Sequence, residues 1–473
     1  MGQARLAVFA FTAAIVGVSG AVNAAVTYNV NSTLDNPDQT INGVCADING
    51  KCTLRAAVME ADFGPNPTAE QITINLPAGP FMLTGELSVI VSLKIVGAGV
   101  GLTIVDANHA DRAFEVTSAG SLFLSGMTIR NGTAAQNGQE LGGAIWARGP
   151  LSLVGCAVET SSAGNVGIGY GGGIFAESTY PGPPAAVLLL DTTISGNASH
   201  TGGGLDLYNR ATVIQHSTLS FNSAFHGAGV FVEQGSLKIE NSTLHQNNAT
   251  DSGGGLLVLN ATATLSYTTL GFNAADADQD SYGSGGGIFA GPGSYVVIKN
   301  CVLQNVNDFT RENDDCSGSV VTITFNILSS SAGCDLAAFA YVIADPLLGP
   351  LKDNGGPTLT EIPGALSPAI EAGSYEGCQG LDGLTLAVDQ RGVKRPIGSK
   401  CDLGAIEVEP IGDANGDGVL DVSDVFFLIN YLFAGGPHPL GRGNVNGDGS
   451  INVSDVFYLI NYLFAGGSPP IGS

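Results

Sequence analysis

This 473-residue sequence contains few charged residues. Charged residues make up 12% of the chain, against about 25% in an average globular protein. The 17 basic residues face 42 acidic ones, which gives a formal charge of −25. Lys and Glu are too few to cover the wet face of a coiled coil. The acidic excess repels phosphate backbones and anionic lipids, so we do not expect nucleic acid as a partner.

Long apolar runs are also missing after the N-terminus. The apolar stretch Leu6–Val18 follows Arg5 and precedes the small and aliphatic residues of Ser19–Ala24. This order is typical of a cleaved export signal, and the run is short for a bilayer. We therefore expect residues 1–24 to be a signal peptide and the mature chain to be secreted or associated with the cell surface, with no transmembrane segment.

Cysteine is scarce and has no metal-binding spacing. All eight cysteines follow residue 24, and the sequence has no Cys-x-x-Cys pair and no Cys/His cluster, so zinc and redox chemistry are not expected. An even number of cysteines suits disulfides in an oxidising compartment. We expect Cys45 to pair with Cys52 and Cys378 with Cys401, while the sequence leaves the connectivity of the others open.

Glycine, by contrast, is abundant, with 68 residues, and it belongs to a repeat. Short apolar strands anchored at Ile194, Leu219, Leu244 and Leu270 recur every 25 or 26 residues, and an asparagine follows each one. Between them, glycine clusters lead into a second strand. One such coil cannot close a hydrophobic core, so neighbouring coils must stack into a solenoid. The clusters are Gly142–Gly143, Gly171–Gly173, Gly202–Gly204, Gly227–Gly229, Gly253–Gly255 and Gly285–Gly287.

These asparagine and glycine turns resemble those of the pectate-lyase-like family. The resemblance implies an all-β fold, a right-handed parallel β-helix solenoid with end caps, over residues 72–340. In that fold, asparagines at one turn stack into a ladder of side-chain amides. The residues that match the ladder are Asn197, Asn222, Asn247 and Asn273, and we expect their role to be structural.

Two further segments resemble the ends of exported β-helix proteins. Residues 25–71 form an expected N-terminal cap, in which Cys52-Thr-Leu-Arg-Ala-Ala57 resembles the Cys-Ser-Leu-Arg-Glu-Ala motif and opens an amphipathic helical segment. Residues 341–409 contain Asp353-Asn-Gly-Gly-Pro-Thr358 and Asp389-Gln-Arg-Gly392. This order resembles the choice-of-anchor Q region, which precedes varied attachment segments.

An acidic loop followed by an apolar helical segment is duplicated at the C-terminus, with an offset of 31 residues between Val422 and Val453. Oxygen-bearing residues stand at loop positions 1, 3, 5, 7, 9 and 12, where ligands converge on Ca²⁺, and Gly418 and Gly449 stand at the sharp turn. The predicted ligands are Asp413, Asn415, Asp417, Val419, Asp421 and Asp424 in the first loop and Asn444, Asn446, Asp448, Ser450, Asn452 and Asp455 in the second.

Residues 411–469 resemble a type I dockerin, which implies a small α-helical module built on two calcium loops. The resemblance also implies docking to a cohesin-bearing scaffold or cell-surface protein through loop positions 10 and 11, which here hold Val422 with Ser423 and Val453 with Ser454. The first loop has four carboxylates and the second has two. We therefore expect the second calcium site to be the weaker one.

Outward positions after the glycine clusters supply candidate residues for polysaccharide chemistry. Glu177, Asp206 and Glu233 are the candidate catalytic acids, with Glu177 and Glu233 about two coils, or roughly 9.6 Å, apart, near the range of an inverting carboxylate pair. Trp146, Phe175 and Phe231 form a candidate glycan platform. The alternative is that a loop covers these aromatic residues and the acids only keep the surface hydrated.

Three functions remain open at this stage. The chain binds or degrades polysaccharide as a hydrolase or lyase within an extracellular complex, or it is a non-catalytic surface or adhesion protein. In the third reading the C-terminal module is a calcium-dependent structural cap without a cohesin partner. No nucleotide-binding fingerprint or serine-nucleophile motif points to another class of enzyme.

Overall fold

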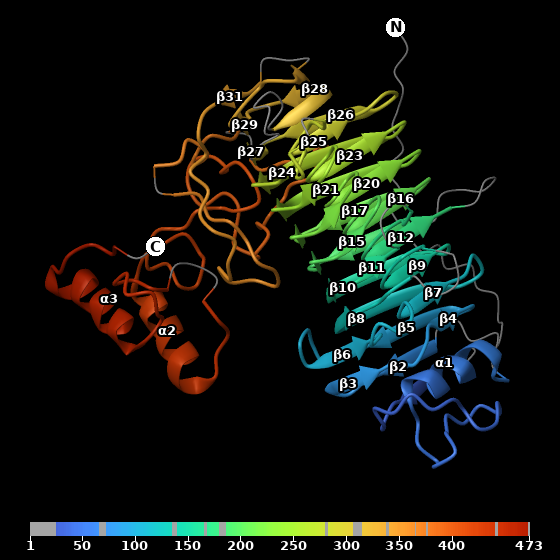
Figure 1. Cartoon of the computed structure of the whole chain (residues 1–473). Coiled ribbons are helices and arrows are strands. Elements are labelled where there is room, and N and C mark those ends of the chain that lie inside the picture. Colours follow the sequence, from blue (N-terminus) through green and yellow to red (C-terminus); the bar gives the residue numbers. More distant parts are fainter. Residues whose placement is uncertain are drawn as a thin grey trace, which may run out of the picture.

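The computed structural model describes residues 25–65, 72–134, 140–164, 168–178, 186–279, 282–305, 315–336, 340–364, 366–374, 377–439 and 443–471. The expected signal peptide at residues 1–24 lies outside them. The described strands wind into one stack of coils that runs from the N-terminal cap to the C-terminal covering segments (Figure 1). The right-handed parallel β-helix predicted from the repeat is confirmed.

The strands of successive coils pair in parallel and form a 27-stranded sheet with three faces, together with a separate four-stranded sheet. Face 1 follows the glycine clusters. It contains β4 (Leu87–Val89), β7 (Phe114–Val116), β9 (Ile145–Ala147), β12 (Ile174–Glu177), β16 (Leu205–Tyr208), β20 (Val230–Glu233), β23 (Leu256–Leu259), β25 (Ile288–Ala290), β28 (Cys316–Ile323) and β30 (Cys334–Leu336).

Face 2 follows face 1 along each coil, and several of its strands continue through a bend into face 3. It contains β1 (Val26–Asn29), β2 (Ile72–Asn75), β5 (Ser92–Val96), β13 (Ala186–Leu190), β17 (Ala211–Gln215), β26 (Tyr295–Lys299) and the first halves of β8 (Ser121–Arg130), β10 (Leu151–Glu159), β21 (Ser236–His245) and β24 (Thr262–Gly271).

Face 3 precedes the asparagine turn, and the short sheet follows that turn. Besides the second halves of the long strands, face 3 contains β3 (Gly79–Met82), β6 (Thr103–Asp106), β14 (Thr193–Ser195), β18 (Thr218–Ser220), β27 (Val302–Gln304), β29 (Ile327–Leu328) and β31 (Val342–Ile343). The short sheet contains β11 (Ser162–Ala163), β15 (Ala198–Ser199), β19 (Ser223–Ala224) and β22 (Asn248–Ala249).

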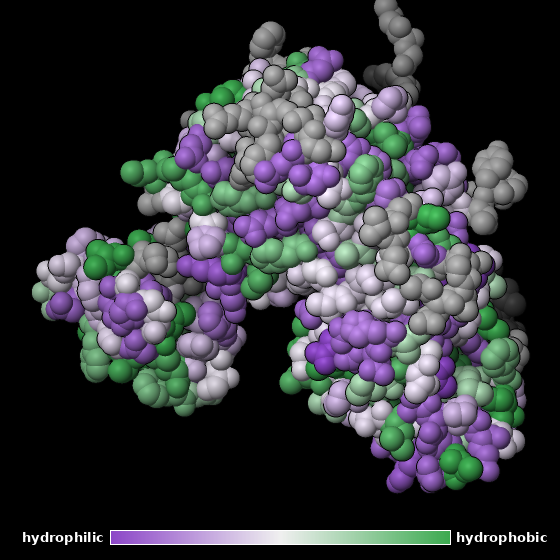
Figure 2. Space-filling model, in the orientation of Figure 1, coloured by the Kyte–Doolittle hydropathy of each residue, from purple (hydrophilic) through white to green (hydrophobic). Residues whose placement is uncertain are grey.

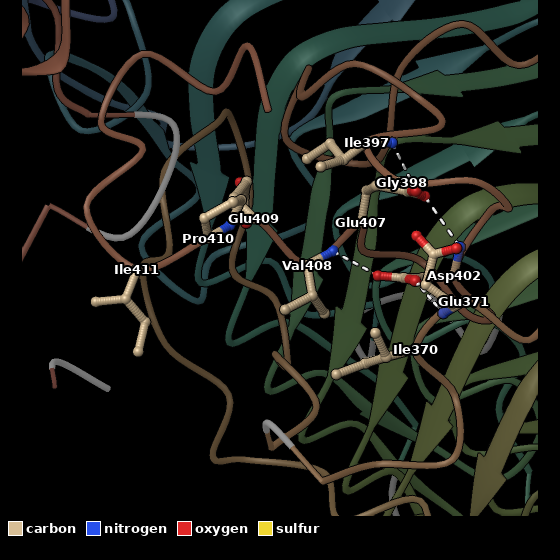
Figure 3. A pocket seen from close by; sticks show the side chains of 10 residues that line it. All are labelled: Ile370, Glu371, Ile397, Gly398, Asp402, Glu407, Val408, Glu409, Pro410 and Ile411. Atoms are coloured by element: carbon tan, nitrogen blue, oxygen red, sulfur yellow. Dashed lines mark hydrogen bonds between the residues drawn. The ribbon is translucent and has the colours of Figure 1, made fainter. Parts of the chain in front are cut away.

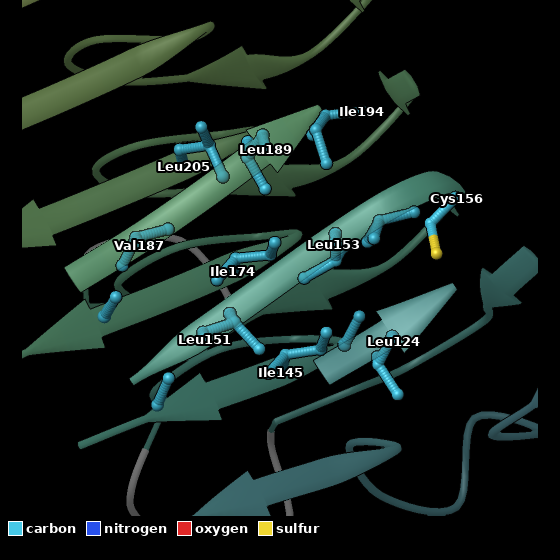
Figure 4. Packing of buried hydrophobic residues seen from close by; sticks show 14 of the residues in the cluster. Leu124, Ile145, Leu151, Leu153, Cys156, Ile174, Val187, Leu189, Ile194 and Leu205 are labelled. Carbon is cyan, nitrogen blue, oxygen red and sulfur yellow. The ribbon is translucent and has the colours of Figure 1, made fainter. Parts of the chain in front are cut away.

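Inward side chains from all coils form one continuous hydrophobic core. Ile145, Ile174 and Leu205 stack in register on face 1 and are fully buried, and Leu153 and Leu189 face them from the next strands (Figure 4). Because each coil contributes only a few apolar side chains, its core is closed by the coils above and below it. Coils that follow one another in the sequence therefore pack against one another in the structure.

The asparagine ladder is present and longer than predicted. Asn197, Asn222, Asn247 and Asn273 are fully buried, and each Nδ2 donates to the Oδ1 of the asparagine one coil further on, at 2.8–3.0 Å. The ladder continues through Asn305, whose Nδ2 donates to Asp315 Oδ1 at 3.0 Å. Burial raises the pKa of Asp315 to about 6. Each amide thus ties two coils together where the chain turns sharply.

The N-terminal cap is a single helix with its supporting loop. In α1 (Leu54–Phe63), Thr53 is the N-cap residue and accepts a hydrogen bond from the Ala56 amide. Arg55 forms a two-pronged ion pair with Asp35, at 2.8 and 3.0 Å, and this pair ties the helix to the preceding loop. The predicted Cys45–Cys52 disulfide is present. The helix closes the end of the β-helix core, as the amphipathic pattern predicts.

After β31, the described residues 344–364, 366–374 and 377–409 pack over face 3 of the later coils and form only isolated bridges (Figure 1). Gln390 is their buried anchor. Its Nε2 donates to Thr218 Oγ1 at 2.9 Å, and its Oε1 accepts from Thr243 Oγ1 at 2.7 Å. His245 Nδ1 lies 2.9 Å from Glu361 Oε1 in a second buried contact. This covering segment therefore protects the side of the solenoid.

The disulfide predictions were correct but incomplete. Cys378–Cys401 is present within the covering segment. A third disulfide joins Cys316 to Cys334, and Cys156 and Cys301 are free thiols buried in the core. None of the described helices combines the length and the apolar character needed to cross a bilayer.

Candidate functional site

The first calcium-type loop is organised around two buried carboxylates. Asp413 accepts backbone hydrogen bonds from Gly416 at 2.8 Å and from Gly418 at 2.7 Å, and Gly418 takes the positive φ of +86° that a sharp turn requires. Asp424 Oδ1 accepts from the backbone amides of Ala414 and Asn415. Loop and helix are thereby joined, because Asp424 also closes the capping box of α2 (Val422–Ala434).

The second loop repeats this arrangement with one change. Asp455 Oδ1 accepts from the amides of Val445 and Asn446, at 2.7 and 3.1 Å, and caps α3 (Val453–Ala465). Asn444 replaces the first loop's Asp413, and its Oδ1 is buried and has no hydrogen-bond partner among the described residues. A buried oxygen without a donor is costly unless a cation satisfies it.

The electrostatics of the first loop favour a bound cation. Burial, with the nearby charges of Asp424 and Asp417, raises the pKa of Asp413 to about 6. Burial, with the charge of Asp417, also raises the pKa of Asp424. A divalent cation would relieve this repulsion. Within the described residues, no three Asp, Glu, His or Cys side chains form a group that could hold a metal ion.

The two helices of the module have an inner face and a strongly apolar outer face. Ala414, Val425, Leu428, Val445, Val456 and Leu459 form the small core. On the outer face of α2, Phe426 and Phe433 are 64% and 69% exposed. On α3, the equivalent Phe457 and Phe464 are 65% and 66% exposed. Apolar surface is visible on the module in Figure 2. Val422 and Val453 extend these two outer faces at the helix starts and are also exposed.

The predicted register of the candidate acids on the β-helix is present. On face 1, Phe175 pairs with Asp206 and Asp206 with Phe231, while Glu177 and Glu233 both pair with Tyr208. The two glutamates therefore lie on alternate coils. Glu177 Oε1 accepts a hydrogen bond from Trp146 Nε1 at 3.1 Å.

Asp206 is held in an unusual environment between these two glutamates. Burial, reinforced by the charges of Glu233 and Glu177, raises its pKa to about 7 even though Thr201 donates a hydrogen bond to it. The Asp206 side chain is thus poised to hold or release a proton near neutral pH. It is only 2% exposed, however, so a ligand could reach it only after a local rearrangement.

The aromatic column does not form an open platform. Trp146, Phe175 and Phe231 are 7%, 6% and 8% exposed. At Gly202, where φ is +60°, the chain turns so closely that a Cβ would strike the backbone of Leu205. Because the chain reverses here, the residues that come just before the glycine clusters, such as Tyr170 and Thr201, lie over face 1. The Tyr170–Phe175 ring contact and the Thr201–Asp206 hydrogen bond show this arrangement.

Sequence analysis did not identify Arg210 as part of this region. Arg210 is fully buried, donates from Nη2 to the carbonyl oxygen of Ala147, and has no hydrogen-bond partner at Nε or Nη1 in the described part of the chain. Burial lowers its pKa to about 10, and the charge of Glu177 opposes that shift. The signal available in the sequence was that Arg148 and Arg210 are the only basic residues between positions 131 and 237.

A second group of carboxylates, also missed, surrounds a pocket of about 310 Å³ where the covering segment meets the module (Figure 3). Asp402 accepts from the amides of Glu371 and Val408, and Glu407 accepts from the amides of Ile397 and Asp402. Burial raises the pKa of Glu407 and of Glu409 to about 7. Backbone amides occupy the oxygens of Asp402 and Glu407, whereas Glu409 Oε1 lies 2.8 Å from Arg391 Nη2, so the cluster organises loops.

Comparison with known proteins identifies the C-terminal module. Residues 411–464 match the model of the Dockerin type I domain, so this segment is a dockerin type I domain. Domains of this family bind calcium in general. The match covers the module and does not extend to the β-helix, and no curated protein matches the chain.

Two solved structures resemble the chain at low identity. The crystal structure of pectate lyase Pel9A is 12% identical, covers 81% of this chain and 98% of its own, and has a TM-score of 0.38. A mannuronic acid specific polysaccharide family 6 lyase from human gut microbiota is 9% identical, covers 61% of this chain and 88% of its own, and has a TM-score of 0.26. Neither likeness carries an argument about activity.

Proposed function

We propose that this protein is an extracellular β-helix protein that binds or degrades polysaccharide and is held on a cohesin-bearing partner by its dockerin domain. The observation that carries the docking half is the pair of exposed apolar helix faces beside the calcium-type loops. Four phenylalanines that are 64–69% exposed are far more apolar surface than a small module leaves open without a partner. The sequence features of an export signal support the extracellular location.

Docking depends on both the loops and the helices in this proposal. Each loop would bind one Ca²⁺ through the six oxygen donors predicted from its spacing, and the ions would fix the helix starts. Val422 with Ser423, and Val453 with Ser454, stand at those starts, so they would contact the partner together with the outer phenylalanines.

The docking proposal is tested by capturing the intact protein on immobilised cohesin modules in calcium and in excess chelator. We expect capture in calcium, its loss in chelator, and a loss of at least tenfold in affinity for the double variant Phe426→Ser, Phe457→Ser. Phe325→Ser is the matched control, because Phe325 is a 53% exposed phenylalanine of the β-helix. Capture that survives the chelator, or survives the double variant unchanged, would disprove this docking mode.

For the polysaccharide half, Glu177 and Glu233 are the proposed catalytic pair. Their separation by two coils suits an inverting hydrolysis, in which one carboxyl protonates the leaving oxygen and the other activates water. Asp206 lies between them and would tune their charge. The test is product analysis on a panel of polysaccharides with the parent, Glu177→Gln and Glu233→Gln. Cleavage that is unaffected by both variants would exclude this pair.

Burial of the aromatic column favours a second candidate function. Trp146, Phe175, Phe231 and Asp206 are at most 8% exposed, so this part of face 1 is covered in the described structure. The protein would then be a non-catalytic surface protein that presents its solenoid from a scaffold, and the dockerin domain would serve only for attachment. Glycan binding without any turnover on the same panel would support this function over the catalytic one.

A further inference from the structure

A groove of the described β-helix lies on the short sheet, away from the candidate acids. It has a volume of about 600 Å³. Its floor is a column of outward side chains from consecutive coils, Ala198, Ser223 and Asn248, which pair in register. The floor therefore offers a small or polar side chain at each coil, about 4.8 Å apart. That repeat is comparable to the length of one sugar unit in an extended chain.

One wall of the groove is a pair of stacked rings. His200 and Phe225 occupy the same position on neighbouring coils, with ring centroids 5.1 Å apart and planes inclined by 9°. Phe225 is 43% exposed although it is a large apolar side chain. Behind it, His226 contacts Phe225 edge-on and pairs with Asp251 at 2.9 Å, which fixes the orientation of the wall. Rings held in this way are rigid surfaces for packing against the C–H face of a sugar.

The charge of the groove narrows the class of ligand. Among the described residues that line it there is no lysine, arginine, aspartate or glutamate, and His200 is the one titratable side chain in that set. Ser223, Asn248 and Thr250 supply hydroxyl and amide groups that donate and accept hydrogen bonds. A uronate polymer would find no cationic partner here, whereas a neutral glycan matches both the rings and the polar floor. We infer that this groove binds a neutral oligosaccharide along the axis of the β-helix.

This inference rests on the proposed polysaccharide-related function and adds the place and the ligand class. The groove is linked to the acid column through one short connection, since Thr201 follows His200 and donates its hydroxyl to Asp206. An oligosaccharide in the groove would thus lie next to the residues, such as Thr201, that cover face 1. The groove would position the chain, and the candidate acids would remain the site of any cleavage.

The test is calorimetric titration of the intact protein in calcium with two sets of probes. Neutral cello-, xylo- and manno-oligosaccharides form one set, and oligogalacturonate and oligomannuronate form the other. We expect a neutral probe to bind and the uronates to bind at least tenfold more weakly. Phe225→Ala should weaken neutral binding at least tenfold, and Ser223→Trp, which fills the floor without removing a ring, should abolish it. Tyr295→Ala, at a 56% exposed aromatic residue of face 2, should bind like the parent.

Each contrary outcome identifies what has failed. If uronates bind and neutral probes do not, or if both groove variants bind like the parent, the groove assignment is overturned while the polysaccharide function stands. If Glu177→Gln abolishes neutral binding and the groove variants do not, the ligand lies on face 1 and the groove assignment fails. If no probe of either set binds, the groove assignment and the polysaccharide half of the proposed function fail together.

Discussion

The β-helix and the dockerin domain reach a stable fold by opposite means. The β-helix has one core that runs through all its coils, an amide ladder that ties them together, and covering segments over face 3. The dockerin domain has six buried apolar residues beside two loops, and in the second loop the buried Asn444 Oδ1 has no donor among the described residues. The long solenoid is therefore sustained by packing, and we expect the small module to depend on a bound cation.

The largest effect should follow from removing one loop carboxylate. Asp424 is fully buried and accepts three backbone hydrogen bonds, so Asp424→Ala leaves those amides unpaired and removes a predicted calcium ligand. We expect a loss of about 4 kcal/mol or more, which is enough to unfold the module. Calorimetry should show the module's transition disappear while that of the β-helix is unchanged.

The matched control for this variant is Asp335→Ala, at an exposed aspartate of the solenoid. It should leave both transitions in place. A shift of the β-helix transition in Asp424→Ala would contradict the independence of the two regions.

The ladder provides the reverse test. Asn222→Ala removes a fully buried amide that donates to Asn247 Oδ1 and to the Ile194 carbonyl, and it leaves the Asn197 amide without its acceptor. We expect about 3 kcal/mol of destabilisation, confined to the β-helix transition in chemical denaturation. Asn209→Ala, at a turn asparagine outside the ladder, should have a much smaller effect. Equal effects of the two variants would mean that the ladder adds no stability.

The pH dependence of stability should also distinguish the β-helix with its covering segment from the dockerin domain. The folded pKa of about 7 for Glu407 lies above its ordinary value of 4.5, so the folded state holds more protons between these values, and stability falls as pH rises through this window. We expect the β-helix with its covering segment to be more stable at pH 5 than at pH 8, by on the order of 2 kcal/mol.

Thermal unfolding in saturating calcium measures this difference. Glu407→Gln, which keeps the shape of the side chain and cannot ionise, should flatten the profile. Stability that rises from pH 5 to pH 8 in the parent would refute this reading of the buried carboxylates.

The smallest expected effect separates the two calcium loops. Asn444→Asp gives the second loop the carboxylate that the first loop has at Asp413, so we expect calcium to bind the second loop about tenfold more tightly. Calcium titration of the parent should show one tight and one weaker site, and the variant should bring them closer together. Two equally tight sites in the parent would contradict the predicted asymmetry.

Local repetition made the solenoid and the calcium-type loops predictable from the sequence. The spacing of 25 or 26 residues identified Asn197 through Asn273 as a ladder, but the next steps, to Asn305 and Asp315, are 32 and 10 residues long, so the end of the ladder was missed. The Cys316–Cys334 disulfide was missed because sequence separation alone does not choose between pairings.

The candidate glycan platform shows a different kind of limit. Alternation along a strand correctly predicted that Phe175 and Phe231 point out of the core. Alternation could not predict that the chain reverses at the glycine clusters, so that Tyr170, Thr201 and their equivalents cover the outward side chains of face 1. The direction in which a side chain points is set by its own strand, whereas its exposure also depends on other segments of the chain that pack over it. For the same reason the His200–Phe225 groove was not foreseen.

Hydrogen exchange of the intact protein, measured in calcium and after addition of excess chelator, tests the central comparison most directly. We expect the chelator to increase exchange throughout the dockerin domain, including both helices, and to leave the β-helix strands as protected as before. Increased exchange spread over the strands, or unchanged protection of α2 and α3 without calcium, would contradict this expectation.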